Sequence, residues 1–157
     1  MKFIADSMLG RLARWLRLSG YDVLYANDIL DESILEQAKS GRILLSKDKN
    51  LCKKAESRGI DAMLVTSDDI LEQLKQVAME RNLIIRSTPE FSRCPLCNAA
   101  VEKIEKEKIR DRVSKSVFKR SEEFWECKSC GKIYWHGGHW KNIRERVRRI
   151  DVGVQGA

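Results

Sequence analysis

The sequence predicts an α/β protein of three layers, in which helices cover both faces of a central parallel sheet, followed by a small second module. Short apolar runs alternate with helical stretches over residues 1–86, a pattern typical of strands that pair in parallel through helical crossovers. Beyond residue 86 the alternation stops, and four cysteines follow in two pairs. A chain of 157 residues has room for one ordinary core and one accessory module.

Each element follows from a local pattern of apolar and turn-forming residues. Four strands are expected, at residues 2–5, 22–26, 42–45 and 61–66. A helix is expected after each strand, at residues 8–18, 31–40, 49–58 and from Ser67 through Val77. Ser67 fits a helix N-cap, whereas Gly41 and Gly59 fit helix ends. This order predicts a parallel sheet with helices on both faces.

The boundary between the two parts is predicted near Arg86, where the helical pattern ends. Residues 87–90 (STPE) combine a proline with small and polar residues, as linkers do. We therefore expect a first domain over residues 1–88, a second domain over residues 89–150, and a disordered tail over residues 151–157.

The second domain carries two CxxC pairs, formed by Cys94 with Cys97 and by Cys127 with Cys130. A spacing of two residues lets both thiolates of a turn face one ion, and two such turns complete a tetrahedral four-cysteine zinc site. Gly131 suits the tight turn after the second pair. Disulfides are the alternative, and reducing conditions in the cytoplasm disfavour them. The sequence therefore predicts a closed, structural Zn²⁺ site that stabilises a polar module.

The aromatic residues of the second domain have two open interpretations. Trp125, Tyr134, Trp135 and Trp140 interleave with arginine and lysine, as residues of base-stacking surfaces do. A zinc module of this size also needs aromatic side chains for its own core. We expect two or three of the four in that core.

His136 and His139 lie just downstream of the second cysteine pair. Four cysteines already fill a zinc tetrahedron, so we expect these histidines to contact nucleic acid or to be structural rather than to bind the metal. The fifth cysteine, Cys52, lies beside Leu51 at a helix position, and we expect it to be buried packing.

Positive charge is concentrated in the C-terminal part of the chain. The net charge is +7. Residues 1–90 hold 14 basic and 14 acidic residues, whereas residues 91–157 hold 16 and 9. Four zinc-bound thiolates would lower the charge of the second part to about +5. A basic module beside a neutral one indicates an anionic polymer as partner, with a merely solvated surface as the alternative.

The sequence shows no pattern of a membrane or export segment. No apolar run approaches the roughly 18 residues that cross a bilayer. Residues 1–17 lack the order of a secretory signal, because Asp6, Arg11 and Arg14 interrupt the apolar residues. We therefore expect a soluble, cytoplasmic protein with no membrane partner.

Acidic residues follow every predicted strand, and parallel strands end at the same edge of a sheet. The acids expected to converge there are Asp6, Asp28, Asp31, Asp48, Asp68 and Asp69. Any one of them has a structural alternative, because aspartate is common in turns and at helix N-caps, as at Asp31. Asp6 fits that alternative least, since it follows an apolar strand and has no obvious local partner.

Several carboxylates at one edge predict a cation site. Carboxylates repel each other unless a cation lies among them, and Mg²⁺ and Mn²⁺ favour oxygen ligands. One or two such ions could activate a water and stabilise the charge that develops on a phosphodiester. Basic side chains that could hold an anionic substrate lie nearby in the sequence: Lys47, Lys49, Arg11, Arg14 and Arg17.

The two halves together resemble a known family. KFIADSMLGRLARWLRLSGYDV, DESILEQAKSGRILLSKDKNL and the knuckles FSRCPLCN and WECKSCGKIYWHGGHW are similar to the Mut-seven C-terminal RNase family, to about residue 150. The resemblance implies a PIN-like nuclease domain followed by a zinc ribbon. The family's acid after the first strand corresponds to Asp6, its D-x-x-I acid to Asp31, and its T/S-x-D acid to Asp48.

One residue of the larger PIN domains has no counterpart here. They carry a glutamate on the helix after the first strand, and this sequence shows no acid at the corresponding spacing. Asp28, Asp68 and Asp69 are the candidates to replace it. The number of catalytic ions therefore stays open.

The resemblance implies Mg²⁺- or Mn²⁺-dependent cleavage of RNA, with Asp6, Asp31 and Asp48 as the catalytic residues that hold the metal. We expect Asp69 as the fourth catalytic residue, with Asp68 as the alternative. The expected partner is single-stranded or structured RNA, with the ribosome as a further candidate, and a small-molecule substrate is not expected. The missing glutamate favours an alternative, a non-catalytic RNA- or ribosome-binding adaptor. A DNA nuclease stays open as well, because nothing in the sequence reads a 2′-hydroxyl.

Overall fold

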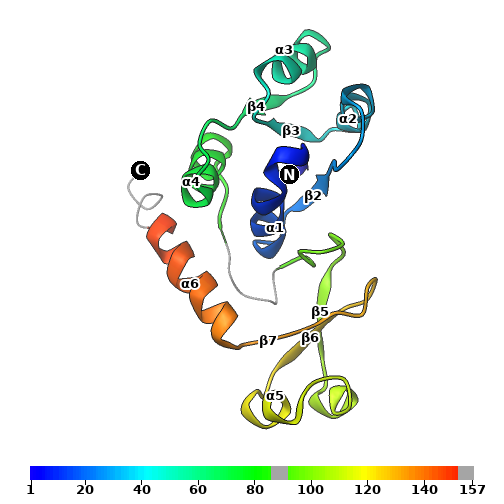
Figure 1. Cartoon of the computed structure of the whole chain (residues 1–157), viewed down its shortest axis with the longest axis vertical. Coiled ribbons are helices and arrows are strands. Elements are labelled where there is room, and N and C mark those ends of the chain that lie inside the picture. The colour runs from blue at the N-terminus through cyan, green and yellow to red at the C-terminus, as the bar shows by residue number, and fades with distance from the viewer. Residues whose placement is uncertain (86–91, 152–157) are drawn as a thin grey trace.

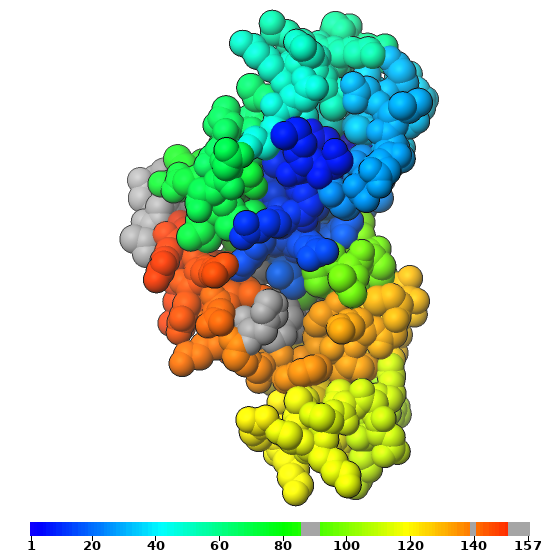
Figure 2. Space-filling view, viewed as in Figure 1, coloured from blue at the N-terminus to red at the C-terminus, as the bar shows by residue number. Residues whose placement is uncertain are grey.

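The computed structural model describes residues 1–85 and 92–151, with the backbone alone for residues 139, 140 and 151. The predicted linker at residues 87–90 and residues 152–157 of the predicted tail lie outside the described residues. The molecule is elongated (Figures 1 and 2). The parallel sheet and its helices occupy one end, and helix α5 (Lys115–Arg120) lies at the other.

Four parallel strands form the central sheet, as the alternating pattern predicts. They are β1 (Lys2–Ala5), β2 (Asp22–Tyr25), β3 (Ile43–Ser46) and β4 (Ala62–Leu64). Their spatial order is β2-β1-β3-β4, so the chain leaves β1 toward one side of the sheet and β3 toward the other. The carboxyl ends of β1 and β3 therefore form the topological switch point, where open α/β sheets bind their ligands.

Helices cover both faces of this sheet, which confirms the predicted three layers (Figure 1). They are α1 (Gly10–Leu18), α2 (Asp31–Ala38), α3 (Lys49–Ser57) and α4 (Ile70–Arg81). Side chains alternate between the faces along a strand. Phe3 packs in one core with residues of α1 and α4, whereas Ile4 packs in a second core with residues of α2 and α3.

The helix starts differ from the sequence-based expectation at three places. The first helix is preceded by a 3-10 turn, η1 (Ser7–Leu9), at whose N-cap Asp6 lies. Helix α4 is capped by Asp69, and Ser67 instead accepts a hydrogen bond from the Asp69 amide. Asp31 is not an N-cap, because Leu30 holds that position and Asp31 is the first residue of α2.

The second module is built on an antiparallel sheet of three strands in the order β5-β6-β7. They are β5 (Val101–Ile104), β6 (Phe124–Cys127) and β7 (Ile133–Trp135). A 3-10 turn, η3 (Lys106–Ile109), and α5 lie between β5 and β6. Trp125 is fully buried, and Tyr134 and Trp135 are half-buried. These three supply the core aromatics that the sequence predicts, and the side chain of Trp140 lies outside the described residues.

The C-terminal helix α6 (Gly138–Asp151) returns to the first domain and lies beside α4 (Figure 1). Its buried residues Ile143, Val147 and Ile150 lie on one helical face and belong to the same core cluster as residues of α1 and α4. The division at residue 88 stays a prediction. Helix α6 follows the zinc-binding cysteines in the sequence, but it packs on the core of the first domain and stabilises it.

Within the described ranges, no helix combines the length and the apolar character that crossing a bilayer requires.

Candidate functional site

The four paired cysteines meet at one point. Their sulfurs all lie within 4.8 Å of one another, with Cys94 Sγ 3.6 Å from Cys130 Sγ and Cys97 Sγ 3.3 Å from Cys127 Sγ. Zinc with bonds of about 2.3 Å to four sulfurs places them about 3.8 Å apart. All five cysteines are unbridged, so the disulfide alternative is not realised. The donor set and its spacing fit a structural Zn²⁺.

The two knuckles have the same local backbone. The residue directly after each pair, Asn98 and Gly131, has a left-handed conformation with φ of 67° and 72°. The amide of each donates to the carbonyl of the first cysteine of its pair, over 2.9 Å at Cys94 and 2.8 Å at Cys127. Glycine and asparagine are the residues that adopt this conformation most readily. The glycine at position 131 predicted its turn from the sequence, whereas the turn at Asn98 was not predicted.

The surroundings of the cluster assign structural roles to two further residues. The hydroxyl of Tyr134 lies 3.1 Å from Cys94 Sγ. The ring of His136 packs edge-on against Trp125, with the ring centroids 4.9 Å apart. This contact gives His136 a packing role, one of the two roles that the sequence leaves open for it. The side chain of His139 lies outside the described residues.

The first knuckle is fastened to the α/β domain by hydrogen bonds. Arg17 of α1 donates from Nε to the carbonyl of Val23 and from Nη1 to the carbonyl of Pro95, both over 2.9 Å. Asn98 accepts from the Val23 amide over 3.0 Å and donates to Asp22 over 2.8 Å. Arg17 is only 7% exposed, so it belongs to this contact and not to the phosphate-binding stripe that the sequence suggested.

The acidic site lies at the switch point of the sheet. Asp6 directly follows β1 and is 5% exposed, and Ser46, the last residue of β3, is fully buried. The Ser46 hydroxyl donates to Asp6 Oδ2 and accepts from the Asp48 amide over 2.9 Å. One serine thus links the Asp6 carboxylate, which follows β1, to the main chain at Asp48, which follows β3.

Both acids also have structural hydrogen bonds. Asp6 Oδ1 accepts from the Met8 amide over 3.0 Å, so the expectation that Asp6 lacks a local partner was wrong. Asp48 caps α3, because its Oδ1 accepts from the amides of Asn50 and Leu51. Such bonds to backbone N–H groups fix the direction of each carboxylate.

Cys52 lies behind these acids. It is 4% exposed, as the sequence predicts. Burial raises the pKa of its thiol to about 11, with further contributions from the charges of Glu56, Asp6 and Asp48. A thiol of this kind stays protonated and unreactive at neutral pH.

The remaining acids do not join Asp6 and Asp48 in one cluster. A metal site built by side chains alone needs three or more cysteine, histidine or acidic side chains whose ligand atoms lie close together. Among the described residues, the four cysteines are the one group that meets this condition. Asp31 is exposed at the start of α2, and Asp28 is exposed in the preceding loop with φ of 55°. Asp69 caps α4 through Oδ1, and Asp68 forms an ion pair with Lys47.

The predicted substrate-binding cations differ in their availability. Lys47 is engaged with Asp68. Lys49 is exposed at the first position of α3. Arg11 and Arg14 are exposed on α1 and line a cavity of about 290 Å³.

A family model described as the Mut7-C RNAse domain matches residues 1–147. The chain belongs to this family. No curated protein and no solved structure matched in the corresponding comparisons.

Membership in the Mut7-C RNAse domain family suggests a nuclease-like function on RNA. The match spans both the acidic edge of the sheet and the four cysteines, so the two sites belong to one family unit. The resemblance drawn from the sequence motifs is confirmed. The catalytic residues carried over from it stay a prediction.

Proposed function

We propose that this protein is a ribonuclease of the PIN type that hydrolyses RNA phosphodiesters with Mg²⁺ or Mn²⁺. The observation that carries the proposal is that Ser46 links the Asp6 carboxylate to the main-chain amide of Asp48, which places both residues at the switch point of a Mut7-C RNAse domain. Carboxylate oxygens are ligands that hard divalent cations such as Mg²⁺ and Mn²⁺ prefer. Asp6, Asp31 and Asp48 would hold the ion, with Asp69 or Asp68 assisting.

Each residue has a separate task in this proposal. A bound Mg²⁺ or Mn²⁺ would supply charge stabilisation at the phosphodiester and lower the pKa of a water. Asp6 is held in place by Ser46 and the Met8 amide, so its carboxylate does not need to reorganise when it takes part. Both helix-capping bonds of Asp48 go to Oδ1, and neither uses its Oδ2. Lys49, exposed beside it, would attract the substrate phosphate.

The zinc module would serve this activity by binding RNA. The Zn²⁺ ion would have a structural role, because four cysteine ligands leave no open coordination position. The basic charge of residues 91–157 favours an anionic polymer. A cytoplasmic location, with cellular RNA as substrate, belongs to the same proposal.

A second candidate function is a non-catalytic adaptor that binds RNA or the ribosome. Asp31 does not reach a ligand cluster with Asp6 and Asp48 among the described residues, and both oxygens of Asp6 already accept hydrogen bonds. This arrangement favours a site that folds without a catalytic ion. The adaptor would bind RNA without cleaving it.

Cleavage of labelled single-stranded RNA separates the two functions. The parent should cleave with Mg²⁺ or Mn²⁺ and stop on their removal, and Asp6→Asn should lose cleavage while it keeps its fold. Asp61→Asn is the control, because Asp61 precedes β4 at the opposite edge of the sheet. Equal cleavage by Asp6→Asn and the parent would remove Asp6 from the mechanism. RNA binding without turnover under either ion would favour the adaptor.

A further inference from the structure

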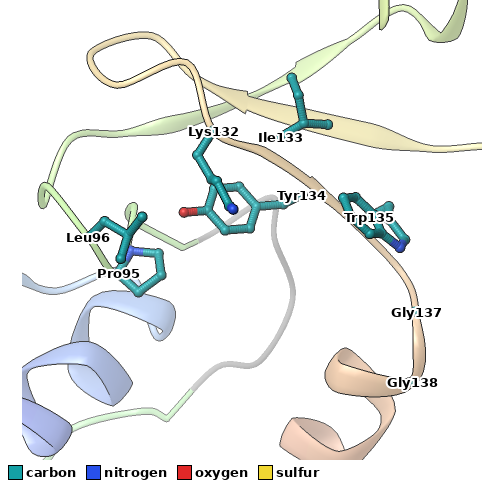
Figure 3. Close-up of a pocket in the computed structure, with 8 residues that line it drawn as sticks. All are labelled: Pro95, Leu96, Lys132, Ile133, Tyr134, Trp135, Gly137 and Gly138. Atoms are coloured by element: carbon teal, nitrogen blue, oxygen red, sulfur yellow. The ribbon is translucent and has the colours of Figure 1, made fainter. Parts of the chain in front are cut away.

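A cavity of about 460 Å³ lies between the first knuckle and the start of α6. Figure 3 shows Tyr134 between the knuckle residues Pro95 and Leu96 on one side and Trp135 on the other. Lys132 also lines this cavity, so a cation accompanies the aromatic rings. Volumes of this size are typical of sites for small organic groups. We call it the aromatic cavity.

The approach of Trp135 to the backbone is unusually close. A methyl group placed on Gly137 would lie 3.0 Å from the indole Nε1 and 3.3 Å from Cδ1. Glycine therefore lets the indole lie against the chain that leads into α6. The ring is held on the wall of the cavity by this contact and by packing against the small core near α5.

A second cavity, of about 290 Å³, also borders the first knuckle. Its lining includes Arg11, Arg14 and Tyr25, and it shares Pro95 and Leu96 with the aromatic cavity. We call it the arginine cavity. The two cavities are therefore neighbours, separated by the tip of the first knuckle, where Leu96 is 56% exposed.

Two of the three arginines that line the arginine cavity are available for a ligand, whereas the third, Arg17, is engaged with the carbonyls of Val23 and Pro95. Among the described residues, neither Arg11 nor Arg14 forms an ion pair. A third basic cavity, on the opposite edge of the sheet, differs in this respect. It is lined by Arg42 and Arg58, which are paired with Asp22 and Glu32. Unneutralised guanidinium groups in a cleft attract phosphate, whereas paired ones do not.

The arginine cavity leads toward the acidic site. Tyr25, on its wall, donates a hydrogen bond over 2.8 Å to the carbonyl of Ser7, the residue after Asp6. Gly10 permits this position, because a methyl group there would lie 3.0 Å from Cζ and from the hydroxyl oxygen of Tyr25. A strand in the arginine cavity would thus approach the end of β1.

We propose that the two cavities are adjacent subsites for one single strand of RNA. Trp135 stacks a base in the aromatic cavity, and Arg11 and Arg14 bind a backbone phosphate next to it. The knuckle tip at Pro95 and Leu96 lies between them, and the strand continues toward Asp6. This inference rests on the proposed action on RNA and assigns the part of the molecule that selects the substrate.

The arrangement selects single strands over duplexes. A base can enter the aromatic cavity only when it is unstacked and unpaired, as in loops and ends. Aromatic stacking accepts every base, because every base has a π-face. Arginine contacts to phosphate carry no sequence information. The pair of subsites therefore predicts a preference for single strands over duplexes and little preference for base sequence.

The test is equilibrium binding of fluorescent RNA by the full-length, zinc-loaded chain. All variants carry Asp6→Asn and receive no added divalent ion, so the result does not depend on cleavage. The probe is a single strand of about 12 nucleotides, within the site sizes of single-strand-binding modules. A matched duplex and a single strand with abasic positions are the comparison ligands, each titrated at several salt concentrations.

The two subsites should give different signatures. Trp135→Ala should weaken single-strand binding about 5- to 150-fold, with an unchanged salt slope and with no remaining difference between the normal and the abasic strand. Trp135→Phe keeps a ring and should stay close to the parent. Arg11→Ala with Arg14→Ala removes the contact to one phosphate and should lower the salt slope by about 0.7. Lys53→Ala with Lys75→Ala, exposed cations that line neither cavity, should leave the slope nearly unchanged.

Each arm can overturn the proposal. Parent-like binding by Trp135→Ala, or loss in the folded Trp135→Phe variant equal to that of the alanine variant, would exclude base stacking. A parent-like salt slope for the arginine variant would exclude the phosphate subsite. Equal losses on duplex and single strand would assign the surface to a duplex ligand instead. Retained binding with no cleavage in the divalent-ion assay would contradict the proposed ribonuclease and leave this inference standing.

Discussion

Arg17 of α1 donates a hydrogen bond from Nη1 to the main-chain carbonyl of Pro95, 2.9 Å away in the first zinc knuckle. The same side chain bonds Val23 of β2 through Nε. Further contact comes from the Arg93 amide, which donates to the Arg17 carbonyl over 2.6 Å. The cysteine cluster is thereby fixed to the sheet domain by backbone groups as well as by side chains.

Substitution of Arg17 by methionine should destabilise the protein by about 2 to 4 kcal/mol, because it leaves two acceptors without their donor at a buried contact. The free energy of unfolding in urea measures the effect. Arg14→Met is the matched control on the same helix, since Arg14 is exposed, and its effect should stay within about 0.5 kcal/mol. Similar losses for both variants would show that Arg17 contributes no more than a surface arginine.

Asp22 should make stability depend on pH in the acid range. Its hydrogen bond from Arg42, offset partly by burial and aided by Asn98, lowers the pKa of the carboxyl to about 2. A carboxyl whose pKa is lower in the folded state stabilises the fold above its unfolded pKa of about 3.9, and this contribution is lost as the pH falls toward 2.

The free energies of unfolding of the parent and of Asp22→Asn should therefore differ most above about pH 4 and converge toward about pH 2. Arg42→Gln should show the same convergence, because it removes the main partner. A difference that stays constant from pH 5 to pH 2 would contradict the role assigned to this pair.

Zinc binding should depend on the paired cysteines and not on the fifth. Cys127→Ser removes one of four ligands and should abolish stoichiometric zinc, as measured by elemental analysis of the purified chain. Cys52→Ala is the control and should retain the parent's zinc content, since Cys52 lies beside the acidic site. Full zinc retention by Cys127→Ser would exclude the four-cysteine site.

Ser46 should position the two acids without contacting the substrate. Ser46→Ala removes the hydroxyl that joins Asp6 to the Asp48 amide and should lower RNA cleavage about 10- to 100-fold, the range for residues that orient metal ligands. Ser46→Thr keeps the hydroxyl and should recover most of the activity. If the alanine variant cleaves like the parent, Ser46 has no positioning role.

Much of the fold follows from local patterns in the sequence. The apolar runs before Asp6 and Ser46 predicted two buried parallel strands, and sheet topology alone then placed the acids that follow them at one edge. The cysteine spacing predicted the cluster because two CxxC turns have few other uses. Strand order and the pairing of β1 with β3 required the structure, since alternation does not specify which strands are neighbours.

Other features depended on contacts between distant segments. Arg17 follows Ala13 by four residues and so lies on the buried face of α1, but only the position of the Pro95 carbonyl explains why a cation is tolerated there. Asn98 carries a left-handed turn that its sequence position did not reveal. The return of α6 to the first core required the structure as well, because amphipathic spacing predicts a buried face and not its partner.

The most direct test of the acidic site is a crystal of the parent soaked in Mn²⁺ and examined by anomalous scattering. We expect a manganese peak beside Asp6 and Asp48 in the parent and no such peak in Asp6→Asn, with the zinc peak at the cysteines as the internal standard in both crystals. A parent crystal with the zinc peak and no manganese at Asp6, or an unchanged manganese peak in Asp6→Asn, would contradict this expectation.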